Sequence, residues 1–243
     1  MTNYKEIWKW MIVPMVVMQV GIFYDYWGDF SENAWSVHIH YWAGTAWYLF
    51  LIIQPYLVTH GQIERHRTIG MIGMFLAGGV CITALAMQHR DVLSAQQSAE
   101  YPERFGPFQP SFFYGVVVVE FVMMVAFGFA VIQSVIHRKE IRNHSWWLMS
   151  TVFIIMMPAL GRGIQFVQAA LSNGQAADLD IMLGLYITEF IIIALLLLAA
   201  WRSNTLRHPG TYLALAVNLF TFLIEPIGKI EGVQMFLRAV IKA

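Results

Sequence analysis

Long apolar stretches separated by short polar connections dominate the chain. A bilayer core about 30 Å thick needs about 20 apolar residues per helix, so stretches of that length between charged clusters predict membrane-spanning helices. Seven stretches meet this condition, at residues 8–26, 36–59, 68–88, 112–136, 146–171, 181–201 and 210–227. We therefore expect an all-α integral membrane protein, a single domain over residues 1–243 built as a bundle of seven transmembrane helices.

Composition excludes most other classes. Hydrophobic residues make up 58% of the chain and charged residues only 12%, whereas a soluble domain is about 25% charged. The 15 Lys and Arg residues balance the 15 Asp and Glu residues, which argues against a nucleic-acid partner because such partners attract an excess of positive charge. A single cysteine, Cys81, excludes an internal disulfide and a thiolate metal cluster.

The two sides of the predicted bundle differ in charge. With the N-terminus inside, the inner segments hold Lys5, Lys9, Arg65, Arg67, Arg138, Lys139, Arg142, Arg202 and Arg207, and the outer loops hold Arg90 and Arg104. The acidic residues Asp25, Asp29, Glu32, Asp91, Glu100, Glu103, Asp178 and Asp180 fall outside. Because basic residues concentrate in cytoplasmic loops, we expect a cytoplasmic N-terminus and an outer C-terminus. The tail 231–243 predicts either a short interfacial helix or a frayed end.

Three charged side chains fall within the predicted membrane helices. Glu120 and Glu189 each lie about nine residues from the outer end of a helix, roughly 13 Å deep at 1.5 Å per residue. Arg162 enters from the opposite side and reaches the same depth. Ionised groups in hydrocarbon are costly, so this polar core predicts a structural charge pair, a proton path or the polar end of a ligand cavity.

The eight histidines form two layers, one near each predicted membrane face. The outer layer holds His38, His40 and His89, and the inner layer holds His60, His66, His137, His144 and His208. Two neutral imidazoles from different helices at one depth can ligate a haem, and three converging histidines can hold zinc. Histidine is also common at membrane boundaries for its amphipathic ring, and no HExxH or HxxxH spacing occurs.

The segment HYWAGTAWYLFLIIQPYLVTHGQIERHRTIG resembles a family of bacterial seven-helix membrane proteins known as a domain of unknown function. The residues that carry the resemblance are His40, Trp47, Gln54, His66, Arg67 and Gly70, and in HSWWLMSTVFIIMMPALGR they are His144, Met149, Pro158 and Arg162. His208-Pro209 is similar to the family's last connection, and the resemblance covers roughly residues 36–228. It implies a multi-pass protein of the bacterial cytoplasmic (inner) membrane and no particular activity.

A looser resemblance is to transmembrane b-type cytochromes, which carry electrons through haems ligated by histidines of neighbouring helices. By helix order, His66 and His144 suit one haem b near the cytoplasmic face, with Arg67 or Arg142 meeting a haem propionate. In the outer layer His40 lacks a histidine partner on the fourth predicted helix, which leaves His89 as the other candidate. The resemblance implies an electron carrier or oxidoreductase, and the aromatic content also suits a quinone or another lipophilic small molecule.

Two other functions remain open at this point. Seven helices with the N-terminus inside are also similar to the progestin and adiponectin receptor and ceramidase group, which implies a metal-dependent hydrolase or lipid-modifying enzyme with zinc on His66, His144 and His208. Alternatively the chain is a transporter, a sensor, or a subunit of an oligomer or membrane complex, with Glu120, Glu189 and Arg162 as its polar core. The sequence leaves open whether the protein is an enzyme.

Overall fold

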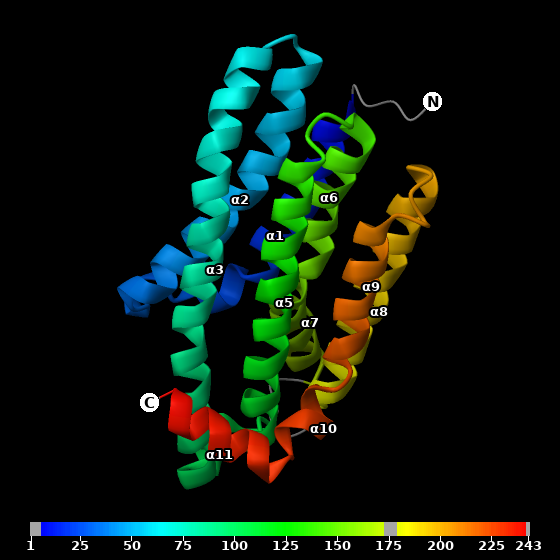
Figure 1. Ribbon diagram of the computed structural model, residues 1–243. Coiled ribbons are helices and arrows are strands. Elements are labelled where there is room, and N and C mark those ends of the chain that lie inside the picture. Colours follow the sequence, from blue (N-terminus) through cyan, green and yellow to red (C-terminus); the bar gives the residue numbers. More distant parts are fainter. Residues whose placement is uncertain (1–5, 173–178, 242–243) are drawn as a thin grey trace.

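The computed structural model describes residues 6–172 and 179–241, and this part of the chain is helical with no β-strand (Figure 1). The helices are α1 (Ile7–Gly21), η2 (Phe23–Gly28), η3 (Phe30–Glu32), α2 (Trp35–Thr59), α3 (Ile63–Glu100), α4 (Pro102–Phe105), α5 (Pro110–Ile136), α6 (Ile141–Ile154), α7 (Met157–Leu171), α8 (Ile181–Arg202), α9 (Pro209–Thr221), α10 (Ile224–Gly228) and α11 (Glu231–Val240). The predicted all-α class is confirmed.

Four helical segments of the described chain are long and apolar enough to cross a membrane. They are Ile63–Glu100, Pro110–Ile136, Ile141–Leu171 and Ile181–Arg202, with α1 as a shorter apolar helix. Many large apolar side chains on these segments face outward, among them Phe75 at 83% and Phe190 at 73% exposure. An apolar exterior of this kind fits a lipid environment, so the chain is a helical membrane protein.

The predicted connection 89–110 is wrong for most of its length. α3 does not stop near residue 88 but continues to Glu100, and α4 follows directly. At 38 residues α3 is about 57 Å long, nearly twice the thickness of a bilayer core. Val92, Ala95 and Ser98 are buried on this extension, because it packs against α5. The polar residues read as a loop are therefore one face of a helix.

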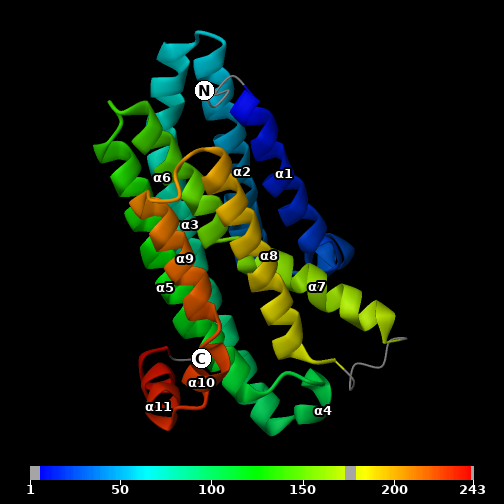
Figure 2. The same ribbon diagram turned by 90° about the vertical axis from the view of Figure 1, so that its right-hand side faces the viewer.

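The predicted helix 146–171 is divided in two. α6 ends at Ile154 and α7 begins at Met157. Pro158 explains the break, since its ring nitrogen cannot donate to the carbonyl of Ile154 and its ring clashes with that carbonyl. Figure 2 shows α7 running obliquely away from α6. A second division affects the predicted helix 210–227, which forms α9 and α10.

α1 is shorter than the predicted helix 8–26, and its end is set by contact with α7. A Cβ on Gly21 would lie 2.3 Å from the carbonyl oxygen of Ala159, and one on Gly163 would lie 3.0 Å from the Cα of Gly21. Only glycine permits so close a crossing. Beyond Gly21 the chain turns through η2, and this brings Asp25 beside α7.

The basic turns gather at one end of the bundle. The α2–α3, α5–α6 and α8–α9 turns and the start of α1 lie together at the top of Figure 1, and α4, α10 and α11 lie at the opposite end. Of the nine basic residues predicted on the inner side, Lys5 lies outside the described residues. The predicted tail helix is confirmed as α11, which packs through the buried Leu237 and an Arg238–Tyr114 hydrogen bond of 2.7 Å.

Candidate functional site

A large cavity opens between α1, α2, α3, α5 and α6 near the end that carries the basic turns. Its volume is about 970 Å³, at the upper end of the range of about 300–1,000 Å³ typical of ligand and cofactor pockets. His66 of α3 and His144 of α6 both line it, and we call it the histidine cavity. Its other polar lining residues are Gln54, Thr59, Arg67, Ser134, Arg138, Lys139 and Ser145.

The two histidines lie close together on the wall of this cavity. Their ring centres are 6.3 Å apart and their planes are at 89°. Both side chains are half-buried, so each ring is held by the fold but reaches open space. The pair joins two helices whose histidines are 78 positions apart in the sequence.

Each imidazole is oriented by a hydrogen bond at Nδ1. His144 Nδ1 donates to the backbone carbonyl of Ser134 at 2.9 Å. Because a carbonyl only accepts, the proton of a neutral His144 is on Nδ1 and its lone pair is on Nε2. In the orientation that satisfies its neighbours, the Gln54 amide nitrogen donates to His66 Nδ1 at 2.5 Å and its oxygen accepts from the Gly70 N–H at 3.2 Å. Both rings therefore have Nδ1 engaged. A neutral His144 keeps its lone pair on Nε2, whereas a neutral His66 carries its proton on Nε2 in this arrangement.

The two arginines predicted to meet a haem propionate, Arg67 and Arg142, lie in different places. Arg67 lines the histidine cavity, together with Arg138 and Lys139 of the α5–α6 turn. Arg142 instead donates to the backbone carbonyl of Asn204 in the α8–α9 turn. Three basic side chains are thus at the mouth of the cavity, and two of them were not singled out from the sequence.

His208 lies apart from the histidine pair. It caps α9, accepting from the backbone N–H of Gly210 at 2.9 Å, and its ring packs edge-on against Trp147 at 5.3 Å. Burial and then the positive charges of Arg142 and His137 lower the pKa of His208, which suits an accepting nitrogen. Within residues 6–172 and 179–241 no group of three His, Cys, Asp or Glu side chains is arranged to hold a metal ion.

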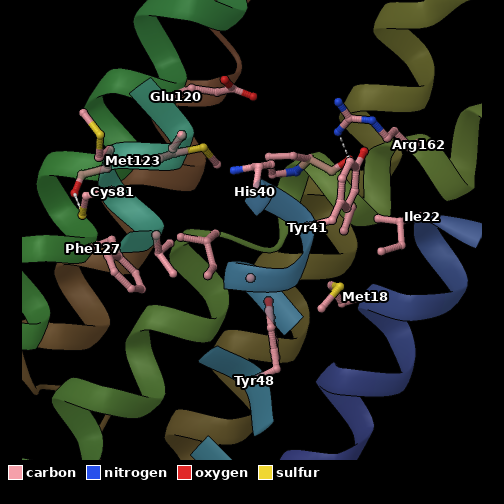
Figure 3. A pocket seen from close by; sticks show the side chains of 17 residues that line it. Met18, Ile22, His40, Tyr41, Tyr48, Cys81, Glu120, Met123, Phe127 and Arg162 are labelled. Carbon is pink, nitrogen blue, oxygen red and sulfur yellow. Dashed lines mark hydrogen bonds between the residues drawn. The ribbon is translucent and has the colours of Figure 1, made fainter. Parts of the chain in front are cut away.

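A second, smaller cavity of about 120 Å³ lies between α1, α2, α3, α5 and α7. His40, Glu120 and Arg162 line it, and we call it the arginine cavity. In Figure 3 Glu120 reaches in from α5 and Arg162 from α7, with His40 between them. Most of the remaining wall is apolar, with Met18, Met123, Met124 and Phe127 among its members.

The ionic partner of Arg162 is an aspartate. Arg162 Nε lies 2.8 Å from Asp25 Oδ2, and Arg162 also donates to the carbonyl of Pro158 at 2.8 Å. Tyr41 donates to the same Asp25 oxygen at 2.7 Å. The Arg–Glu pair considered from the sequence is thus replaced by an Arg–Asp pair, because the turn after α1 folds back against α7.

Further polar groups lie near the arginine cavity on α2 and α3. Asp91 of α3 is an electrostatic neighbour of the Glu120 carboxyl, and two neighbouring carboxyl groups titrate as a pair. His40 Nδ1 lies 3.4 Å from the Thr83 hydroxyl. His89, the other outer candidate, is exposed on α3.

Glu189, the third member of the predicted polar core, does not line either cavity. It is fully buried on α8, on the side that meets α9. Glu120 and Arg162 share the arginine cavity, so the predicted core consists of two separate sites.

An aromatic contact joins the walls of the two cavities. Trp47 lines the histidine cavity and Phe127 lines the arginine cavity. Their ring centres are 4.9 Å apart in an edge-to-face arrangement. Trp47 is fully buried, and its indole nitrogen donates to Thr151 at 3.2 Å, so the wall between the cavities is rigid.

Several site residues had only weak signals in the sequence. Gln54 belongs to the segment that carries the family resemblance. Ser134 belongs to no motif, although both its hydroxyl and its backbone carbonyl lie 2.9 Å from His144 Nδ1. Asp25 and Asp91 were assigned to the outer side as ordinary loop charges. Their contacts depend on the turn after α1 and on the extension of α3, which local patterns do not specify.

In comparisons with protein-family models, curated proteins and solved structures, no match to this chain was found. The resemblances noted in the sequence therefore stay predictions. The residues that carry the first of them do cluster in space: Trp47, Gln54, His66, Arg67, Gly70, His144 and Met149 line the histidine cavity, and His40, Pro158 and Arg162 line the arginine cavity.

Proposed function

We propose that the protein is a membrane electron carrier or oxidoreductase with one b-type haem in the histidine cavity, ligated by His66 and His144. The observation that carries this proposal is the geometry of the pair. An imidazole nitrogen binds a transition-metal ion at about 2.0 Å with its ring centre roughly 1.1 Å further back, so two axial imidazoles on one iron have centres about 6.2 Å apart. The observed separation is 6.3 Å.

The surroundings of the rings support the same function. Ligating histidines generally donate their second nitrogen to a carbonyl or carboxylate, which fixes the tautomer and strengthens the ligand. His144 does so to Ser134. Gln54 would accept from His66 Nδ1 after its amide turns, which exchanges its hydrogen bond from the Gly70 N–H for one from the ring. The apolar wall lowers the local polarity, which is one of the means by which a protein sets the potential of a haem.

The mouth of the cavity suits the charged edge of a haem. Arg67, Arg138 and Lys139 line it, and guanidinium and ammonium groups pair well with propionate carboxylates. Arg142 is engaged with Asn204 and is not part of this proposal. The arginine cavity, about eight times smaller, is too small for a second haem.

The arginine cavity supports a partner for electron exchange. Its volume is close to that of a cavity of about 150 Å³ known to hold benzene, so it suits a single ring such as the head of a quinone. His40 and Glu120 offer hydrogen-bonding groups to ring oxygens. The edge-to-face contact between Trp47 and Phe127 connects the walls of the two cavities through packed rings.

The charge distribution supports a seven-helix arrangement in the bacterial cytoplasmic membrane, with the N-terminus inside. On this topology the basic turns face the cytoplasm, and the haem lies near that face. The arginine cavity then lies on the outer side of the haem.

An absorption spectrum of the purified full-length protein, expressed with haem supplied, tests the proposal. We expect the bands of a low-spin b-type haem in the oxidised and dithionite-reduced protein. His66→Leu and His144→Leu should each lose at least about nine-tenths of the haem, since loss of a ligand exceeds the ten- to hundredfold effect of losing its supporting partner.

The matched control is His208→Asn, which removes a histidine at the same end of the bundle and keeps an acceptor that caps α9. It should bind as much haem as the parent protein. A parent protein without bound haem, or equal haem content in the His66, His144 and His208 variants, would falsify the proposal.

A further inference from the structure

Glu189 is a buried carboxylate that neither cavity uses. Its exposure is 0%, and among the described residues neither of its carboxylate oxygens has a hydrogen-bond partner. An ionised carboxylate in such surroundings is strongly unfavourable unless a positive partner compensates it. The position therefore requires a cation or a proton.

Asn218 of α9 presents a second unpartnered oxygen. Its side-chain nitrogen donates to the carbonyls of Ala214 at 2.7 Å and Phe153 at 3.2 Å. Because carbonyls only accept, these two bonds fix which end of the amide is the nitrogen. Oδ1 then faces the other way, and it is buried with no partner in the described part of the chain.

The register of α8 and α9 brings these oxygens together. The two helices are antiparallel neighbours (Figure 1), and the rings of Tyr186 and Phe222 stack at 5.4 Å. Glu189 follows Tyr186 by three residues, and Asn218 precedes Phe222 by four residues. In antiparallel helices both therefore lie about one turn from the stacked rings, on the same side. The Thr221 hydroxyl lies against the Glu189 carboxylate, and positions 218 and 221 share one face of α9.

The Thr221 hydroxyl can supply a further oxygen. It donates to the carbonyl of Val217 at 3.2 Å, and a hydroxyl that donates in this way still has lone pairs with which to accept. The last turn of α6 contacts the nitrogen side of Asn218 through the Phe153 carbonyl. The negative end of the dipole of α6 therefore lies nearby.

We propose that Glu189, Asn218 and Thr221 form a site for one monovalent alkali cation beside the end of α6. One carboxylate balances one positive charge, whereas a divalent ion would leave a net charge buried. The unpartnered oxygens are the two carboxylate oxygens of Glu189 and Oδ1 of Asn218. A proton on Glu189 would supply a single hydrogen-bond donor for them, whereas an alkali ion would contact all three. Broken helices within membranes recurrently offer this kind of oxygen-rich end to cations.

Thermal unfolding of the full-length protein in detergent tests the site, with Na⁺ or K⁺ compared against choline at equal ionic strength. We expect one alkali ion to raise the Tm saturably by about 5 °C, as expected for a ligand at about 100 times its Kd in a chain of this size. Glu189→Gln should abolish this rise. Asn218→Ala keeps the carboxylate and should raise the half-saturating concentration about tenfold.

Glu120→Gln is the matched control, because it neutralises a different intramembrane glutamate and should keep the full cation effect. Equal stabilisation of all variants would indicate a general salt effect and overturn the site. A second result would also overturn the site. In it, neither ion changes the Tm of the parent protein, and the parent shows an infrared band of a protonated carboxylic acid that Glu189→Gln removes. If Glu189→Gln does not fold, a cation-independent Tm in the parent protein overturns the proposal by itself.

Discussion

The histidine cavity and the arginine cavity lie in the same bundle but differ in volume and in the polar groups that line them. The first is wide, and the ring centres of its two imidazoles are 6.3 Å apart. The second is narrow, and its main charge, Arg162, is already paired with Asp25. Volume and the imidazole pair suit the first to a large cofactor, whereas the second suits a small ring. A histidine in each cavity is therefore not evidence of the same chemistry.

Filling each cavity from a glycine should separate the two functions most clearly. Gly70 lines the histidine cavity, and a Cβ there would meet only Gln54 at 4.0 Å; Gly44 lines the arginine cavity, and a Cβ there would meet nothing within 4 Å. Gly70→Leu should lower haem affinity about ten- to hundredfold, since overpacking costs about 1–3 kcal/mol. Gly44→Leu should keep the haem, measured by its absorbance per protein.

Gly78→Leu is the control for these two variants. It lies on α3 with nothing within 4 Å of an added Cβ, and it lines neither cavity. Equal haem content in the Gly70 and Gly78 variants would contradict the assignment of the haem to the histidine cavity.

Removing the support of His66 should have the next largest effect. Gln54→Leu deletes the amide that contacts Nδ1 at 2.5 Å and keeps an apolar side chain of similar size. Loss of such a partner typically costs 10- to 100-fold in affinity for the metal group, measurable by haem transfer to an acceptor protein. Gln62→Leu, at a surface position bonded to Arg65, should transfer haem at the parental rate.

Breaking the Arg162–Asp25 pair should affect stability more than the haem. The two side chains are 38% and 42% exposed, so a double-mutant cycle with Arg162→Gln and Asp25→Asn should give a coupling of about 0.5–1 kcal/mol. The absorption spectrum should not change in any of the three variants. A spectrum altered by Arg162→Gln alone would show that the two cavities are not independent.

The smallest effect concerns His208, whose pKa is lowered in the fold from 6.5. The unfolded chain then binds the proton more readily than the folded chain. The contribution of His208 to the free energy of unfolding is therefore fully present above about pH 6.5 and decreases as the pH falls below it. We expect the Tm to drop by about 2 °C more between pH 8 and pH 5 in the parent than in His208→Asn. An identical pH profile for both proteins would contradict this role.

Several elements followed directly from the apolar pattern. The predicted helices 36–59, 112–136 and 181–201 agree with α2, α5 and α8 to within two residues at each end, because each is bounded by charges or by proline. The common depth predicted for His66 and His144 agrees with their ring centres being 6.3 Å apart, since basic turns mark one end of each helix. Pro158 was visible but was read as part of one helix, although its missing N–H ends α6.

Other features depend on contacts distant in the sequence. The sequence by itself determined the all-α membrane class and the separation of basic and acidic ends, because hydrocarbon imposes a length and a polarity on each helix. Only the tertiary structure decided that Arg162 pairs with Asp25 and that the Glu189 carboxylate is buried with no hydrogen-bond partner among the described residues. Helix crossings such as that of Gly21 with Ala159 set those neighbours, and crossing geometry is a property of packed surfaces and not of any single segment.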